Sequence, residues 1–281
     1  MVTSITVTGA TGFLGKHVLD RLAELSVNVI AVSRRTAGQP EGDKLRWAEV
    51  DIADPPNNIF AALGRPDVLL HLAWGGLPDY RARNHLERQL PAQLAFLRKA
   101  VEGGLRSLVV AGTCLEYGMQ PGELGESFRC NPDLPYAVAK HALLRELLAL
   151  KADHPFSLTW ARLFYMYGPG QQEKSLWSQF MAAYRRGERE FDMSGGEQLR
   201  DFLPVDKVAE HLAALALAVG DFGVVNVCSG EPVSILALVE SWAEALGWDV
   251  QLNLGRYPYP DYEPMEFWGD NARLKEALAT A

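Results

Sequence analysis

The chain has 281 residues, 48% of them hydrophobic, so it can bury a full core and is long enough for one large domain or a large domain with a smaller lobe. It carries 35 acidic and 27 basic side chains, and the net charge of -8 disfavours nonspecific binding to nucleic acid or to anionic membranes. The three cysteines, Cys114, Cys130 and Cys228, lie far apart without metal spacing, as expected of free thiols in a reducing compartment. No apolar stretch approaches the ~18 residues that span a bilayer, and no targeting pattern opens the chain, so we expect a cytoplasmic protein.

Short β-rich runs alternate with segments of helical periodicity through the first half of the chain. The amphipathic segments are long enough to cross over a sheet and return each strand parallel to the last. This rhythm predicts an α/β fold with a doubly wound parallel Rossmann sheet. The expected strands are 5–8, 27–33, 45–50, 68–72, 107–111 and 158–163, and the expected helices are 14–25, 86–101 and 137–150.

The pattern loosens after Gly168-Pro169-Gly170 and then recovers. Helical periodicity returns over 176–186, 205–219 and 235–246, and a strand is expected over 224–227. We expect two parts: a Rossmann domain of residues 1–167 with return segments near 205–228, and a smaller C-terminal lobe of residues 168–204 and 229–281. The lobe would lie over the strand ends, where α/β proteins bind their substrates.

Three glycines, Gly9, Gly12 and Gly15, stand where the first strand turns into the first helix. One glycine permits the tight turn, another lets the backbone approach a pyrophosphate, and the third lets helix and strand pack closely. The helix N-terminus then faces the phosphates. The spacing predicts that the Rossmann domain binds a dinucleotide.

The second strand ends at Ser33-Arg34-Arg35. An enzyme that uses NAD usually has an acidic residue here, which hydrogen-bonds the adenosine ribose. A small hydroxyl followed by two guanidiniums suits a 2′-phosphate instead, because arginine offers bidentate, permanently charged donors. We therefore expect NADP(H) to be preferred over NAD(H), with Asp51, after the third strand, near the adenine.

Tyr136 and Lys140 are four residues apart on a predicted helix, so they project from one face. An ammonium can thereby lie beside a phenol and a bound cofactor at once. A neighbouring cation favours the ionised phenol, which would bring the tyrosine pKa closer to the range for proton exchange with a carbonyl oxygen. Together with the glycine loop, this pair predicts a nicotinamide redox enzyme.

These residues belong to a longer series of ordered motifs. They include Thr8 to Gly15, His71-Leu72-Ala73-Trp74, Thr113 through Tyr117-Gly118, Arg162 to Pro169, and Arg200 to Asp206. With them, nearly the whole chain resembles the extended short-chain dehydrogenase/reductase family, in the branch of nucleotide-sugar epimerases, dehydratases and reductases. Within that branch the chain is most similar to dTDP-4-keto-6-deoxyhexose reductases.

The resemblance implies roles for individual residues. Tyr136 would be the general acid/base, Thr113 would hydrogen-bond the reacting oxygen, and Lys140 would hold the nicotinamide ribose. The remaining cofactor contacts would be Thr11, Phe13, Leu14, Ile52, Leu72, Ala73 and Leu163. Arg200 would contact the substrate pyrophosphate, and Arg256 and Tyr165 are further substrate candidates. Tyr165 replaces the asparagine that is usual in the family, and Glu116 is one more candidate to face the substrate.

Departures from the family pattern narrow the expected reaction. Dehydratases carry an Asp-Glu pair directly after the catalytic threonine, whereas this chain has Cys114-Leu115, so elimination would lack its general acid and base. Ser33-Arg34-Arg35 disfavours an epimerase, which keeps NAD tightly bound. We therefore expect NADPH-dependent reduction of a nucleotide-linked 4-keto-6-deoxyhexose.

Three alternatives remain open: a nucleotide-sugar 4-epimerase with tightly bound NAD, a non-catalytic NADP-binding sensor, and a reductase of a free carbonyl compound. The resemblance also implies a homodimer formed through helices that include residues 136–150. No metal is expected, because His71 and His141 have no acidic or cysteine partner at ligand spacing.

Overall fold

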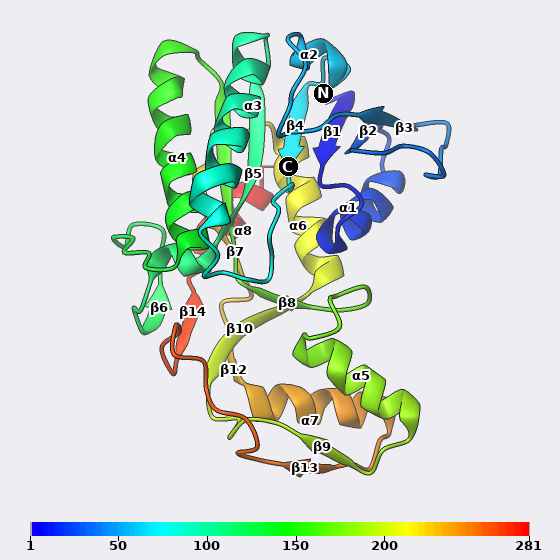
Figure 1. The fold of residues 1–281 in the computed structure, drawn as a ribbon, viewed down its shortest axis with the longest axis vertical. Coiled ribbons are helices and arrows are strands. Elements are labelled where there is room, and N and C mark those ends of the chain that lie inside the picture. Colours follow the sequence, from blue (N-terminus) through cyan, green and yellow to red (C-terminus); the bar gives the residue numbers. More distant parts are fainter. Residues whose placement is uncertain (1, 281) are drawn as a thin grey trace.

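Seven parallel strands form the central sheet of the computed structural model, which describes residues 2–280 (Figure 1). The spatial order is β11-β7-β5-β4-β1-β2-β3. The chain therefore begins in the middle of the sheet, runs outward to β3, and returns to build the other half from β4. The predicted doubly wound Rossmann sheet is confirmed. Its strands are β1 (Ser4–Thr8), β2 (Asn28–Ser33), β3 (Leu45–Glu49), β4 (Val68–His71), β5 (Ser107–Thr113), β7 (Ser157–Leu163) and β11 (Gly223–Val227).

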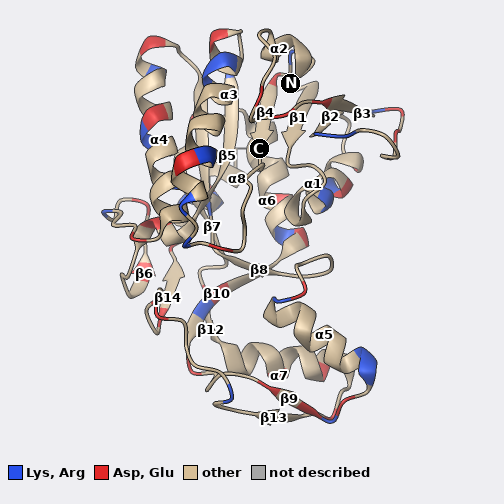
Figure 2. Ribbon diagram, in the orientation of Figure 1, with Lys and Arg blue, Asp and Glu red and all other residues tan. Residues whose placement is uncertain are grey.

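Alternating side chains of the strands pack against helices on the two faces of the sheet. Leu70 and Val109 face one core with helices α1, α6 and α8, whereas Leu69 and Val110 face the other core with α2, α3 and α4. Strands β1, β4 and β5 carry no Lys, Arg, Asp or Glu, as expected of strands covered on both sides (Figure 2). The helices are α1 (Phe13–Ala23), α2 (Ile59–Ala62), α3 (Leu90–Glu102), α4 (Pro135–Asp153), α6 (Val205–Ala218) and α8 (Ala272–Leu278).

The remaining elements lie at the carboxyl ends of the strands of the large sheet (Figure 1). Most of them share a separate apolar core, with Phe180 and Trp242 among its buried members. Strands β6 and β14 contribute Leu124 and Phe267 to another apolar cluster. The helices here are α5 (Leu176–Arg186) and α7 (Ile235–Leu246). The short strands form three groups: β8 (Tyr165–Tyr167), β10 (Leu199–Pro204) and β12 (Pro232–Ser234); β9 (Glu190–Asp192) and β13 (Gln251–Asn253); β6 (Gly122–Leu124) and β14 (Phe267–Gly269).

Helix α8 requires a correction to the expected division of the chain. It lies within residues 229–281, which were assigned to the smaller lobe. Its buried residues Leu274 and Ala277, however, belong to the apolar core that α1 and α6 share with the large sheet. The last helix therefore packs on the Rossmann part. The rest of the proposed division stays a prediction.

Two short helical turns near the candidate site were not predicted as separate elements. A π-helical turn over His85–Gln89 precedes α3, and a 3₁₀ turn over Cys114–Tyr117 follows β5. None of the helices between residues 2 and 280 combines the length and the apolar character needed to cross a bilayer.

Candidate active site

The glycine loop between β1 and α1 is shaped by close backbone approaches. Gly9 has a φ of +71°, and a Cβ atom there would lie 2.8 Å from the backbone nitrogen of Ala73. A Cβ atom on Gly15 would lie 2.1 Å from the carbonyl oxygen of Gly9, so only glycine fits. Gly12 caps α1 without a side-chain hydrogen bond, which leaves the first amides of the helix facing outward for an anion. The loop fits a dinucleotide pyrophosphate.

The other predicted cofactor contacts gather around this loop at the carboxyl edge of the sheet. Thr11, Phe13 and Leu14 stand at the start of α1, Leu72 and Ala73 follow β4, and Leu163 ends β7. Their contacts with a cofactor stay predictions. The fold places them where doubly wound sheets bind ligands, at the switch between the two halves of the sheet.

His71, the last residue of β4, is hydrogen-bonded to Thr8, the residue that precedes the glycine loop. Its ring is fully buried between the Thr8 hydroxyl, 2.8 Å from Nδ1, and the Gln93 side-chain oxygen, 2.7 Å from Nε2. Because Gln93 Nε2 donates to the Ala73 carbonyl, its oxygen must accept, so His71 carries its proton on Nε2. Burial, helped by the charge of Lys140, lowers the pKa of His71 to about 3, so the ring is neutral.

This buried histidine makes stability depend on pH. Above pH 6.5 the His71 ring is neutral in the folded and in the unfolded protein. Between pH 6.5 and about pH 3 the ring is protonated in the unfolded chain but stays neutral in the folded protein. The free energy of unfolding should fall by about 1.4 kcal/mol per pH unit in that window. In His71→Gln this term is absent, so the stability gap between wild type and variant should narrow by roughly 2 kcal/mol from pH 7 to pH 5. Urea unfolding at both pH values measures the gap, and a constant gap would contradict the assignment.

The expected ribose-binding segment lies at the end of β2. Ser33 is half-buried, and Arg34 and Arg35 are exposed. Neither guanidinium takes part in a hydrogen bond or ion pair with any residue between 2 and 280. Asp51 is exposed and accepts a hydrogen bond from the Ala53 amide at 2.9 Å, and the neighbouring Ile52 is half-buried. Both arginines are therefore free to meet a ligand.

Tyr136 and Lys140 lie in the first two turns of α4, where Pro135 starts the helix. Both are buried, with exposures of 7% and 2%. The Lys140 ammonium donates to the Ala111 carbonyl at 2.7 Å and lies 4.1 Å from the centre of the Trp74 ring. Thr113, at the end of β5, lies near enough to Tyr136 to lower the pKa of its phenol. The structure thus brings together the three side chains predicted to be catalytic, and their roles stay predictions.

The expected lowering of the Tyr136 pKa is wrong for this structure. Burial, with smaller contributions from Tyr80 and Glu116, raises that pKa far above its usual value, and the hydrogen bond with Thr113 offsets only part of the rise. Desolvation also lowers the pKa of Lys140 to about 7, which weakens it as a neighbouring cation. Tyr136 is therefore protonated at neutral pH, the state that a general acid requires.

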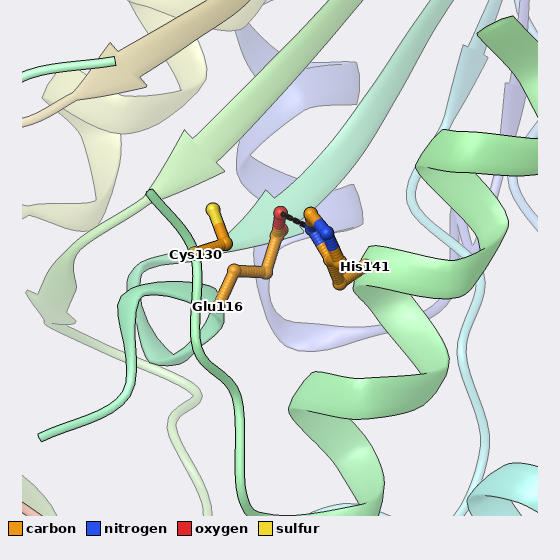
Figure 3. Close-up of side chains that lie close together, drawn as sticks. All are labelled: Glu116, Cys130 and His141. Carbon is orange, nitrogen blue, oxygen red and sulfur yellow. Dashed lines mark ion pairs between the residues drawn. The ribbon is translucent and has the colours of Figure 1, made fainter. Parts of the chain in front are cut away.

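Glu116 does not face the substrate side, contrary to expectation. Its side chain is fully buried and points inward between Cys130 and His141 (Figure 3). The fold thereby gives His141 the acidic and cysteine neighbours that sequence spacing did not reveal. Arg162 donates hydrogen bonds to the Glu116 carboxylate, at 3.1 Å, and to the Cys130 sulfur, at 2.9 Å. The guanidinium of Arg162 thus supplies the cation of this group, and the four side chains form an ion-paired cluster.

Arg200 also differs from expectation. Its exposure is 2%, and its Nε and Nη2 atoms bind the Glu263 carboxylate at 3.2 and 3.0 Å. Its Nη1 atom donates to the carbonyls of Leu199 and Met265. Arg200 is thus held in an internal ion pair, since a buried cation without a partner is strongly destabilising. Its contact with a pyrophosphate stays a prediction.

The two other substrate candidates lie in different surroundings. The Tyr165 hydroxyl is buried beside Glu263, and burial raises its pKa well above the usual value. Arg256 is exposed, with its Nε atom 3.8 Å from a carboxylate oxygen of Asp192. Arg256 is therefore the candidate arginine that remains accessible.

A cleft of about 900 Å³ opens between α5, β9 and the connection that follows β8. Gly168, Pro169, Asp192 and Tyr257 are among its lining residues. His17 of α1 hydrogen-bonds the Pro169 carbonyl at 2.9 Å, which connects the lining of the cleft to the helix that follows the glycine loop. The volume is ample for a small organic ligand. Tyr136, Lys140 and Thr113 do not line the cleft.

A doubly wound sheet, a glycine loop at its switch point and a buried Tyr/Lys/Thr group together define a nicotinamide-dependent enzyme. Comparison with known families agrees: the sequence pattern of the NAD dependent epimerase/dehydratase family matches residues 5–228. The chain belongs to this family and is an NAD(P)-dependent enzyme of the extended short-chain dehydrogenase/reductase type.

Individual relatives match along almost the whole chain. The dTDP-6-deoxy-L-talose 4-dehydrogenase (NAD(+)) of Aggregatibacter actinomycetemcomitans is 27% identical over 95% of this chain and 99% of its own. The structure of MoeE5 in complex with UDP-glucuronic acid and NAD is 30% identical, with a TM-score of 0.81, covering 98% of this chain and 92% of that one. UDP-glucose 4-epimerase from Thermotoga maritima, solved with UDP-glucose, is 26% identical, with a TM-score of 0.80, over 99% and 93% of the two chains.

Proposed function

We propose that the protein reduces the 4-keto group of a nucleotide-linked 6-deoxyhexose with NADPH. The observation that carries the proposal is the buried group of Tyr136, Thr113 and Lys140 beside the glycine loop. The name of the relative from Aggregatibacter, a 4-dehydrogenase of a dTDP-6-deoxy sugar, describes a reaction at the same carbon. Oxidation of a 4-hydroxyl and reduction of a 4-ketone are the two directions of one reaction, so that relative supports the assignment.

The acid chemistry follows from the burial of Tyr136. A bound nicotinamide would supply the hydride for C4 of the sugar. The Thr113 hydroxyl would hydrogen-bond the ketone oxygen, and Tyr136, protonated at neutral pH, would give that oxygen its proton. Lys140, held by the Ala111 carbonyl, would stabilise the resulting tyrosinate.

The residues after Thr113 support a reductase over a dehydratase. Cys114 is buried and burial raises its pKa strongly, so it is a neutral thiol. Glu116, the nearest carboxylate in the chain, is bound to Arg162 and to the Thr113 amide. Elimination of water needs a free acid and base beside the sugar, and this turn supplies neither.

A 4-epimerase with tightly bound NAD is the second candidate. The similarity to UDP-glucose 4-epimerase from Thermotoga maritima along nearly the whole chain favours it, because both reactions use the same hydride-transfer group. The two candidates differ in net cofactor use. A reductase consumes one NADPH for each product, whereas an epimerase returns the hydride and consumes none.

The test is oxidation of NADPH by the purified protein with dTDP-4-keto-6-deoxyglucose, followed by the loss of nicotinamide absorbance. Stoichiometric consumption is the expected result, and the control without sugar should show none. A protein that consumes no NADPH but releases NAD on denaturation would be an epimerase. Product analysis with UDP-glucose would then show galactose formation.

The preference for NADPH rests on Arg34 and Arg35, whose guanidiniums are exposed and unpaired within residues 2–280. In the double variant Arg34→Ala/Arg35→Ala, KM for NADPH should rise on the order of 10- to 100-fold while KM for NADH stays within about threefold, since one charged phosphate contact contributes about 1.5–3 kcal/mol. Arg46→Ala on β3 is the control for a general loss of positive charge. Equal changes for both cofactors would contradict a 2′-phosphate site. The comparison of NADPH with NADH is needed because relatives of the chain are described with NAD.

The expected homodimer and the cytoplasmic location stay predictions. Light scattering of the purified protein at several concentrations tests the first. Fractionation of the source cells tests the second.

A further inference from the structure

The buried Glu116 carboxylate is bonded from three directions. Its Oε1 atom accepts hydrogen bonds from the Thr113 amide at 3.0 Å and from the Trp160 indole at 2.8 Å, and its Oε2 atom accepts one from Arg162 Nε at 3.1 Å. Its exposure is zero. Burying a carboxylate is costly unless charge and hydrogen bonds compensate it, and here both are present.

These bonds join the elements that hold the proposed reaction centre. Thr113 ends β5, Trp160 and Arg162 belong to β7, and His141, whose Nδ1 atom lies 3.8 Å from Glu116, follows Lys140 on α4 (Figure 3). Glu116 also closes a capping box with Thr113 over the 3₁₀ turn. One carboxylate thus connects the backbone of Thr113 to β7 by hydrogen bonds, and it lies beside His141 on the helix that carries Tyr136 and Lys140.

The backbone beside Glu116 is built to admit this arrangement. A Cβ atom on Gly112 would lie 2.2 Å from the Trp160 indole nitrogen and 2.8 Å from Glu116 Oε1. Only a glycine before Thr113 leaves room for the carboxylate and the indole to meet. The last two residues of β5 are therefore shaped around Glu116.

We infer that Glu116 is a positioning residue: its carboxylate fixes the backbone of Thr113 so that the threonine hydroxyl meets Tyr136 and the reacting oxygen. It touches neither substrate nor cofactor, because it is buried behind the turn. This inference deepens the proposed function and rests on it for its kinetic consequences. Its structural consequence, an ordered Thr113 amide, does not depend on the substrate.

The charge of Glu116 gives a second, electrostatic readout. Burial would raise the pKa of its carboxyl, but His141, Arg162 and the Thr113 amide hold that pKa below its usual value, so the group is ionised. The negative charge raises the pKa values of both Tyr136 and Lys140. The other groups that face Tyr136 are Tyr80, Cys114, Thr113, His85 and the Trp74 ring. Those that face Lys140 are His71 and the Trp74 ring. Replacing Glu116 with a neutral residue should therefore lower the pKa values of Tyr136 and Lys140. The basic limb of the pH-rate profile should then move to lower pH.

The kinetic test compares Glu116→Gln, Glu116→Asp and Tyr117→Phe. The Gln variant removes the charge, and the Asp variant keeps the charge beside Arg162 but draws it away from the Thr113 amide. We expect kcat to fall on the order of 10- to 100-fold in both, with KM for the cofactor within about threefold, because small misplacements of a reacting group cost this much. Only the Gln variant should shift the basic limb. Tyr117 lies in the same turn as Glu116 and donates a hydrogen bond of 2.8 Å to Asn226 of β11. Tyr117→Phe removes that bond, so it is the control for simple destabilisation and should keep kcat within about threefold.

Hydrogen exchange measured by mass spectrometry tests the positioning without any substrate. Exchange of the peptide that contains Thr113 should speed up in Glu116→Gln and Glu116→Asp but not in Tyr117→Phe. Unchanged exchange and unchanged kcat in both Glu116 variants would overturn the inference. If the wild type reduces no nucleotide sugar yet exchange still rises in the variants, the proposed function fails and the positioning role stands. If the Gln variant does not fold, the Asp variant decides by the same two measurements.

Discussion

Replacing Tyr136 with phenylalanine should lower turnover roughly 100- to 10,000-fold while the affinity for the cofactor stays within about twofold. The phenol is the predicted proton donor, and its burial keeps it protonated at neutral pH. The ring itself packs against Trp74, His85 and Tyr80, with centroids 5.3 to 5.9 Å apart, and phenylalanine preserves that packing. Steady-state rates and a fluorescence titration with NADPH measure the two effects.

Tyr80→Phe is the matched control for Tyr136→Phe. Tyr80 lies next to Tyr136, is half-buried, and loses the same hydroxyl. Its hydroxyl makes no hydrogen bond with another residue between 2 and 280, so turnover should stay within about threefold of wild type. Full activity in Tyr136→Phe, or an equal loss in both variants, would contradict the assignment of Tyr136 as the acid.

Replacing Gly15 with alanine should weaken NADPH binding on the order of 10- to 100-fold and lower the free energy of unfolding by about 1–3 kcal/mol. The added Cβ would lie 2.1 Å from the Gly9 carbonyl oxygen, which must then move together with the loop that receives the pyrophosphate. Alanine gains up to about 1 kcal/mol in helix propensity over glycine, but the backbone clash outweighs it. Thermal unfolding and cofactor titration measure the two changes.

Gly125→Ala controls for the substitution itself. A Cβ atom on Gly125 would find its nearest neighbour, a carboxylate oxygen of Asp270, at 3.8 Å, which is an ordinary contact. This variant should bind NADPH like the wild type and unfold within about 0.5 kcal/mol of it. If Gly15→Ala behaves in the same way, the close approach in the glycine loop does not constrain the protein.

The internal ion pair between Arg200 and Glu263 changes the picture of substrate recognition. Arg200 was expected to meet a pyrophosphate, but its guanidinium is enclosed by Glu263, two carbonyls and the Phe267 ring, whose centre is 4.7 Å away. The pairing partners are 63 residues apart in the chain. A motif identifies the arginine, but only the fold identifies what it binds.

The sequence by itself determined the Rossmann sheet and the glycine loop. Both follow from local patterns: short apolar strands that alternate with segments of helical periodicity, and glycines placed where a strand turns into a helix. The strands of the large sheet and its main crossover helices were predicted within a few residues. The short strands β6, β8, β9 and β12 to β14 were missed, because three residues cannot show a repeating pattern. The six-residue strand β10 was missed as well.

The tertiary structure alone decided the surroundings of the candidate catalytic residues. Burial raises the pKa of Tyr136 although Lys140 stands one turn away, since desolvation depends on everything packed around the phenol and not on one neighbour. Glu116 turned inward to Trp160, Arg162 and His141, which come from two other elements. Local spacing reveals which residues share a helix face or a turn; long-range packing sets their hydrogen-bond partners and charge states, because those depend on contacts between distant parts of the chain.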